Sequence, residues 1–82
     1  MPKSVFSNKY ILLRQLLIEA RKVANLTQTE LSAKLSRPQS YVSKYERGER
    51  RLDLIEFLEV AVALNINPAT FIEKLLQQKQ ES

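Results

Sequence analysis

The chain contains 82 residues, of which 44% are hydrophobic and 27% are charged, and its net charge at pH 7 is +4. This length supports one modest apolar core, so we expect one domain. No run approaches the roughly 18 apolar residues that span a bilayer, and the amino end lacks a secretory signal, so we expect the protein in the cytoplasm. Cysteine and histidine are absent, which predicts a protein that is not an enzyme and has no metal site, cofactor or catalytic residue.

The first predicted helix runs from about Asn8 to Ala24. No segment of the chain shows the strict alternation of a strand, so we expect an all-α protein. Apolar residues recur along this helix at three- and four-residue steps, and the face expected to be buried consists of Leu13, Leu16, Leu17, Ala20, Val23 and Ala24. Asn25 is the expected terminator, because asparagine tolerates the left-handed conformation that ends helices.

A second helix is predicted from Gln28 to Leu35. Thr27 and Glu30 have the spacing of a capping box, in which each side chain accepts a hydrogen bond from the backbone amide of the other residue. The side chains expected to point inward are Leu31, Ser32 and Leu35.

The third predicted helix extends from Pro38 to Arg47 and stops at Gly48, the only glycine in the chain. Pro38 disfavours helical geometry at Arg37, so the chain must turn between Leu35 and Pro38. The core side chains expected from this helix are Val42 and Tyr45.

Two more helices are predicted in the carboxyl-terminal part. Asp53 with Glu56 forms another cap pair, which opens a helix to Leu64, and Asn67 followed by Pro68 is an N-cap with proline at the first helical position. The five helices make one domain over residues 8–76, and we expect flexible termini at residues 1–7 and 77–82.

The second and third helices are short and joined by a turn of about three residues, which is the geometry of a helix-turn-helix. Because the core side chains point inward, the opposite stripe of the third helix points outward, and it consists of Gln39, Ser40, Ser43, Lys44 and Arg47. Gln39 can present a donor and an acceptor together to an adenine edge, and Lys44 can reach a guanine edge or a phosphate. The alternative is an ordinary solvated helix face.

Positive charge is concentrated beside this stripe. Residues 37–51 contain five Lys or Arg against two Glu, whereas residues 52–82 contain two against five acidic residues. Arg37, Arg47, Arg50 and Arg51 lie at the ends of the third helix, where they are placed to neutralise backbone phosphates. Gln28 stands at a helix N-terminus, where a phosphate is favoured. Solvation of an ordinary surface is the alternative for each of them.

The segment LTQTELSAKLSRPQSYVSKYERGERR, which spans Leu26 to Arg51, resembles the Cro and phage-repressor class of helix-turn-helix proteins. The helix order from Leu12 to about Leu76 matches that class as well. The resemblance implies a five-helix bundle of the lambda-repressor-like type from a bacterium or phage.

The resemblance also implies roles for single residues. Gln28 would clamp a phosphate and brace Gln39, which would read a base alongside Ser40 and Lys44. A structural ion pair between Arg21 and Glu46 is implied as well. One departure is Ser36, which stands at a turn position where the class usually has glycine; a left-handed serine there would cost roughly 1 kcal/mol.

The fourth predicted helix carries two apolar stripes. The first consists of Phe57, Val60, Ala61 and Leu64, and the second consists of Ile55, Leu58 and Val62. Since one stripe suffices for the core, the second indicates a partner surface, and we expect a homodimer through it and the fifth helix. The alternative is that the fifth helix covers the second stripe within one chain, with Phe71, Ile72, Leu75 and Leu76.

These features predict sequence-specific binding of double-stranded DNA by a nucleoid-associated transcriptional regulator. A dimeric repressor would place two reading helices about 34 Å apart on a palindromic operator. The alternative function is that of an antitoxin or adaptor, in which contact with another protein is the main role. Steep loss of duplex affinity with added salt would distinguish the DNA reader from the adaptor.

Overall fold

The computed structural model describes residues 8–77 and contains, within that range, five helices and no strand. The helices are α1 (Asn8–Val23), α2 (Gln28–Lys34), α3 (Tyr41–Arg47), α4 (Leu54–Ala63) and α5 (Pro68–Gln77). The prediction of an all-α, five-helix protein is confirmed. The flexible ends were predicted for residues 1–7 and 77–82, of which 1–7 and 78–82 lie outside the described residues, whereas Gln77 is the last residue of α5.

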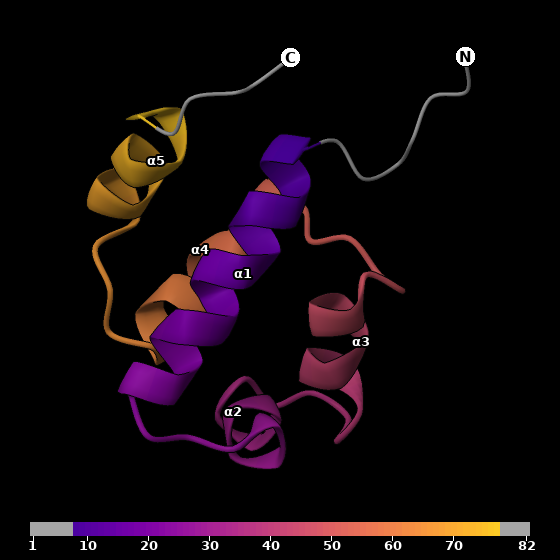
Figure 1. Cartoon of the computed structure of the whole chain (residues 1–82). Helices are drawn as coiled ribbons and strands as arrows, with labels where there is room; N and C mark the ends of the chain where they lie inside the picture. The colour runs from indigo at the N-terminus through magenta and orange to yellow at the C-terminus, as the bar shows by residue number, and fades with distance from the viewer. Residues whose placement is uncertain (1–7, 78–82) are drawn as a thin grey trace, which may run out of the picture.

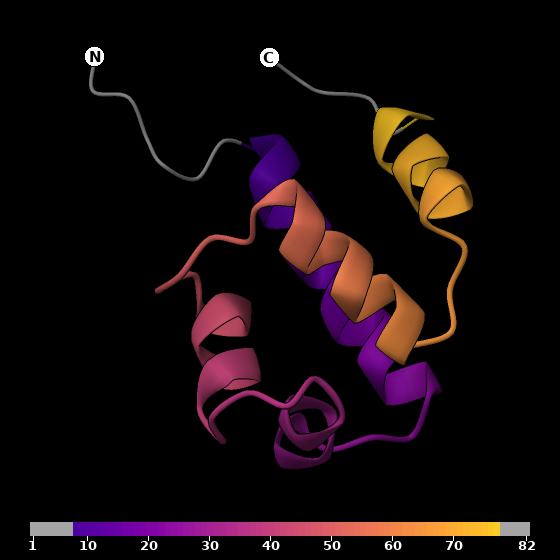
Figure 2. The same ribbon diagram turned by 180° about the vertical axis from the view of Figure 1, so that it is seen from behind.

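The longest helix, α1, lies at the centre of the molecule, and α3 and α5 lie on opposite sides of it (Figure 1). The view from behind shows the same arrangement, with α2 near the carboxyl end of α1 (Figure 2). α3 contacts both α2 and α1. α2 and α3 have only seven residues each, and isolated helices that short are unstable in water, so the pair depends on the packing of the bundle.

All five helices contribute to one core. Its buried side chains are Leu17, Leu31, Tyr41, Val42, Tyr45, Phe57, Val60, Leu64 and Phe71. α5 joins this core through Phe71, whose ring centre lies 5.4 Å from that of Phe57. Burial of one such side chain stabilises the folded state by roughly 1.5–3 kcal/mol.

The last turn of α1 differs from the prediction. Val23 is 87% exposed and Ala24 is exposed as well, so the expected buried face was too long. The chain reverses at Asn25, which has a φ of 63°, and Val23 and Ala24 border an open hollow shared with α5. At the other end of α1, Tyr10 is buried, which the helical spacing did not identify.

The N-terminal caps agree with the sequence. The Thr27 hydroxyl accepts from the Glu30 amide (3.0 Å), and the Glu30 carboxylate accepts from the Thr27 amide (2.8 Å). Asp53 and Glu56 form the same reciprocal pair at α4. The Asn67 side chain accepts from the amide of Ala69 (2.8 Å), as expected for an N-cap before Pro68.

Four helices end with the same backbone turn. The residue in the left-handed region is Asn25 after α1, Ser36 after α2, Gly48 after α3 and Asn65 after α4, with φ values of 63°, 57°, 85° and 59°. At Ser36, the amide of Ser36 donates to the Ala33 carbonyl (3.0 Å) and the amide of Arg37 donates to the Ser32 carbonyl (3.0 Å). This pair of bonds satisfies carbonyls that a helix end leaves open. The predictions for Asn25 and Gly48 are confirmed, the condition under which Ser36 is strained is met, and Asn65 is an addition.

Two negative findings concern residues 8–77. No single helix there is long and apolar enough to cross a membrane, and α4 with α5 meets that criterion only as a pair bent by 114°. No group of three or more Asp or Glu side chains in this range is placed to hold a metal ion.

Candidate nucleic-acid interface

α3 begins at Tyr41, three residues after the predicted start at Pro38. Two hydrogen bonds account for the difference. The Tyr41 amide donates to the Pro38 carbonyl (2.9 Å) and closes a tight turn, while the Val42 amide donates to the Ser32 hydroxyl (3.2 Å) instead of to Pro38. Gln39 therefore lies in the turn immediately before the helix and not within its first turn.

A shallow groove lies between the start of α2 and the start of α3. It is lined by Gln28, Thr29, Gln39, Ser40 and Ser43. Gln39 and Ser40 are exposed, and Ser43 is half-buried with its hydroxyl donating to the Ser40 carbonyl (3.1 Å). Four of the five lining residues are among those selected from the sequence; Thr29, on the first turn of α2, was missed because its side chain carries no distinctive pattern.

Lys44 and Arg47 continue the outward face of α3 and are both exposed. The Arg47 guanidinium donates two hydrogen bonds of 3.0 Å to the carboxylate of Glu49. This contact lowers the pKa of Glu49 and raises that of Arg47, chiefly through the hydrogen bonds between them. The side chains are more than half exposed, at 56% and 53%, so a phosphate can replace this weak partner.

Glu46 connects three helices beneath the interface. Its carboxylate accepts from Arg21 of α1 at 2.8 and 3.2 Å and from the Gln28 amide nitrogen of α2 at 2.8 Å. Glu46 is only 6% exposed, so this is a nearly buried ion pair with an additional hydrogen bond. The Arg21–Glu46 pair implied by the resemblance is confirmed. One amide hydrogen of Gln28 is committed to Glu46, which leaves its second N–H and its oxygen for other partners.

Arg37, in the turn between α2 and α3, and Arg50, in the connection between α3 and α4, share one aromatic ring. Their guanidinium carbons are 5.0 and 4.9 Å from the ring centre of Tyr41. Arg37 donates to Glu59 (2.8 Å), and Arg50 donates to both oxygens of Glu56 (3.1 and 2.8 Å). Both predicted phosphate contacts are therefore paired with carboxylates of α4 in the free protein.

The surroundings of this arginine pair shift two ionisation equilibria. Hydrogen bonds from Arg50, followed by that from the Asp53 amide, lower the pKa of Glu56 to about 2. Burial raises the pKa of the Tyr41 hydroxyl, with a smaller contribution from the Glu56 charge. At neutral pH Glu56 is thus a fully ionised partner for Arg50.

Arg51 is the last of the predicted cationic contacts. Its side chain is exposed, and its guanidinium lies 4.4 Å from the ring centre of Tyr10 at the start of α1. A cation over an aromatic face is attracted by the ring quadrupole, so Tyr10 holds the Arg51 guanidinium near the start of α1.

Comparisons with known proteins agree with this geometry. A family model described as helix-turn-helix matches residues 17–71. Among solved structures, an XRE-family like protein from Pseudomonas syringae pv. tomato str. DC3000 is 48% identical, with a TM-score of 0.81 over 84% of this chain and 84% of that one. This chain belongs to the XRE family of helix-turn-helix proteins. A search of curated proteins finds no match.

Membership in the XRE family makes the chain a DNA-binding transcription regulator whose partner is double-stranded DNA. The matched region runs from α1 into α5 and therefore includes the whole groove between α2 and α3.

Proposed function

We propose that this protein is a sequence-specific transcriptional repressor that binds a palindromic operator as a homodimer. In this proposal the bases are read by Gln39, Ser40, Ser43 and Lys44, and the phosphates are contacted by Gln28, Arg37, Arg47, Arg50 and Arg51. The observation that carries the proposal is the groove in which Gln28 of α2 and Gln39 of the turn before α3 line one surface with Ser40 and Ser43. Such a protein would be found in the cytoplasm on the nucleoid.

The exposed amide of Gln39 supports its assignment as the principal base reader. Its position in the turn before α3 places it at the edge of the groove, where a helix inserted into DNA first meets the bases. A bidentate contact to an adenine edge contributes about 1–3 kcal/mol of discrimination. Selection of bound duplexes from a random pool should therefore return a consensus, and Gln39→Ala should relax one position in each half-site.

The outcome of that experiment separates base reading from phosphate binding. If Gln39→Ala left both the affinity and the base preference unchanged on the selected operator, the proposed reading face would be wrong. Arg51→Ala serves as the comparison, because Arg51 is an exposed residue assigned to a phosphate, and its loss should lower the affinity without changing the base preference. A palindromic consensus would support two-fold symmetry, whereas a single unrepeated half-site would contradict it.

The proposed phosphate contacts fall into two groups, which differ in the ion pairs that the arginine must give up to bind a phosphate. Arg51 and Arg47 are exposed, and the weak partner of Arg47 is readily displaced. Arg37 and Arg50 must share or leave the carboxylates of Glu59 and Glu56 to bind a phosphate. Each phosphate neutralised changes the slope of log affinity against log salt by about −0.9, so the slope measured for each arginine variant counts its contact directly.

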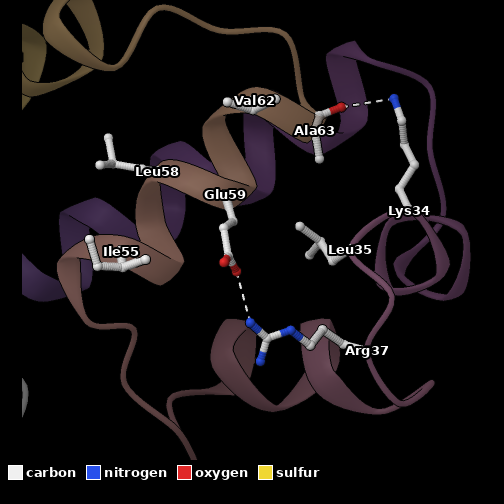
Figure 3. A pocket seen from close by; sticks show the side chains of 8 residues that line it. All are labelled: Lys34, Leu35, Arg37, Ile55, Leu58, Glu59, Val62 and Ala63. Carbon is white, nitrogen blue, oxygen red and sulfur yellow. Dashed lines mark hydrogen bonds and ion pairs between the residues drawn. The ribbon is translucent and has the colours of Figure 1, made fainter.

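The proposed dimer surface is the outward face of α4, where apolar side chains line a shallow hollow with charged groups at its edge (Figure 3). Ile55 is 62% exposed and Val62 is 77% exposed, so α5 does not cover this stripe and the single-chain alternative is wrong. At the edge, the Arg37–Glu59 pair and the Lys34 ammonium, which donates to the Ala63 carbonyl (2.9 Å), provide both signs of charge. A surface with apolar centre and mixed-charge rim can pair with its own copy across a two-fold axis.

Sedimentation equilibrium tests the dimer. Wild-type protein should associate, and Val62→Glu should remain monomeric while keeping its helical circular dichroism. Leu76→Glu, which places the same charge on an exposed residue of α5, asks whether α5 takes part as well. A wild-type chain that stays monomeric both alone and on its operator would contradict the dimer. Weak duplex binding that depends little on salt would favour the adaptor function, in which this face binds a different protein.

A further inference from the structure

A buried serine of α2, Ser32, bonds to the backbone of the turn that carries Gln39. It is 0% exposed. Its hydroxyl donates to the Gln39 carbonyl (3.3 Å) and accepts from the Val42 amide (3.2 Å). One side chain of α2 thus holds the backbone of the next helix on both sides of its first residue.

The start of α3 lacks the usual local cap. The first amides of a helix have no intrahelical acceptor, and Val42 is 0% exposed, so solvent does not reach its amide. Ser40 occupies the N-cap position but makes no side-chain cap hydrogen bond, because its φ of −86° and ψ of 0° are not those of an extended residue. The Ser43 hydroxyl is used on the Ser40 carbonyl. The cap for Val42 comes from Ser32 instead.

We propose that Ser32 is a positioning residue for base reading: by capping α3 from α2 and holding the Gln39 carbonyl, it fixes the direction in which the Gln39 side chain enters the groove. This inference rests on the proposed function, in which Gln39 reads a base. A bidentate contact needs two atoms aligned at once, so a small rotation of the Gln39 backbone weakens discrimination more than it weakens overall binding.

The test separates the effect of the Ser32 hydroxyl from the effect of the small size of its side chain. Ser32→Ala still fits the buried position, and Ser32→Cys nearly preserves the shape while its thiol is a poor hydrogen-bonding group. Leu31→Val is the matched control, since Leu31 is also 0% exposed on α2 but makes neither of the two hydrogen bonds.

The first readout is a ratio of two affinities. One is for the selected operator, and the other is for that operator with the base changed at the position that Gln39→Ala identifies. Because both affinities are measured on one protein, a loss of folded protein cancels in the ratio. A good bidentate contact corresponds to roughly 5- to 150-fold discrimination, and we expect both Ser32 variants to lower the ratio at least about threefold while Leu31→Val leaves it unchanged.

The second readout is hydrogen exchange of the Val42 amide relative to that of Val60 in the core. Loss of its acceptor should accelerate exchange of the Val42 amide in Ser32→Ala and not in Leu31→Val. If Gln39→Ala lowers the affinity ratio and neither Ser32 variant does, the positioning role is overturned and the proposed function stands. If Gln39→Ala changes the preference at no position, the reading face fails and the positioning role with it. Unchanged Val42 exchange in Ser32→Ala overturns the cap independently of DNA.

Discussion

The buried pair between Arg21 and Glu46 predicts a large and asymmetric mutational effect. The Arg21 side chain is 12% exposed and the Glu46 side chain 5%, and they share hydrogen bonds of 2.8 and 3.2 Å. Replacing Arg21 by leucine leaves a buried carboxylate whose remaining side-chain donor is the Gln28 amide. Breaking a buried pair from one side costs about 3–5 kcal/mol, and the retained Gln28 bond places the expected loss near the lower end, about 3 kcal/mol.

This loss is large for a small domain, because about 0.05–0.15 kcal/mol per residue is typical of total stability. Urea unfolding followed by circular dichroism at 222 nm measures it. Arg47→Leu is the control, since it breaks the exposed pair between the last residue of α3 and Glu49 and should change stability by no more than about 1 kcal/mol. The double variant Arg21→Leu/Glu46→Leu should recover part of the loss, because no unpaired charge remains buried. A loss below about 1 kcal/mol for Arg21→Leu, or a double variant no more stable than that single variant, would refute the reasoning.

Three further predictions concern charge and backbone geometry. Arg51→Ala should weaken binding to all duplexes alike and reduce the salt slope by about one, as titrations at several salt concentrations will show; an altered base preference would contradict its phosphate role. Ser36→Gly should raise the free energy of unfolding by up to about 1 kcal/mol in urea, because relief of the left-handed conformation is partly offset by the greater freedom of glycine in the unfolded chain. Ser36→Ala should not stabilise, and if it did so equally, backbone strain would not be the cause. Glu56 has a folded pKa of about 2, below its usual value of 4.5, so its contribution to stability is present above pH 4.5 and is lost as the pH falls towards 2. Glu56→Gln should flatten the dependence of stability on pH in that window, and parallel curves for the two proteins would contradict this.

Most of the fold could be predicted because its signals are local. Thr27 with Glu30 and Asp53 with Glu56 mark helix starts, and both pairs form the expected reciprocal bonds. Local sequence signals did not predict features that depend on contacts between residues far apart in the chain. The start of α3 was predicted at Pro38 from the proline alone, but the acceptor that takes the Val42 amide lies ten residues earlier in the chain. The exposure of Val23 likewise depends on where the other helices end, which the spacing of apolar residues does not specify.

Most residues of the candidate site could be predicted from the sequence, but the hydrogen bonds and ion pairs that hold them could be predicted less well. The groove contains Gln28, Gln39, Ser40 and Ser43, all of which stand out by residue type and helical phase. Their supports are harder to read from sequence. The pairing of Arg37 with Glu59 spans 22 positions. A polar residue on an inward face suggests that the Ser32 hydroxyl makes hydrogen bonds. The sequence does not show that its partners are the Gln39 carbonyl and the Val42 amide.

The shortness of the two helices in the DNA-reading unit has a practical consequence for engineering. Because α2 and α3 have seven residues each, a synthetic peptide restricted to residues 27–48 will be a largely unstructured coil. Transplanting that segment into a foreign scaffold would leave behind the contacts of α1 that keep it ordered. New operator preferences are better sought by exchanging the outward side chains on the intact domain, with its interior left as it is.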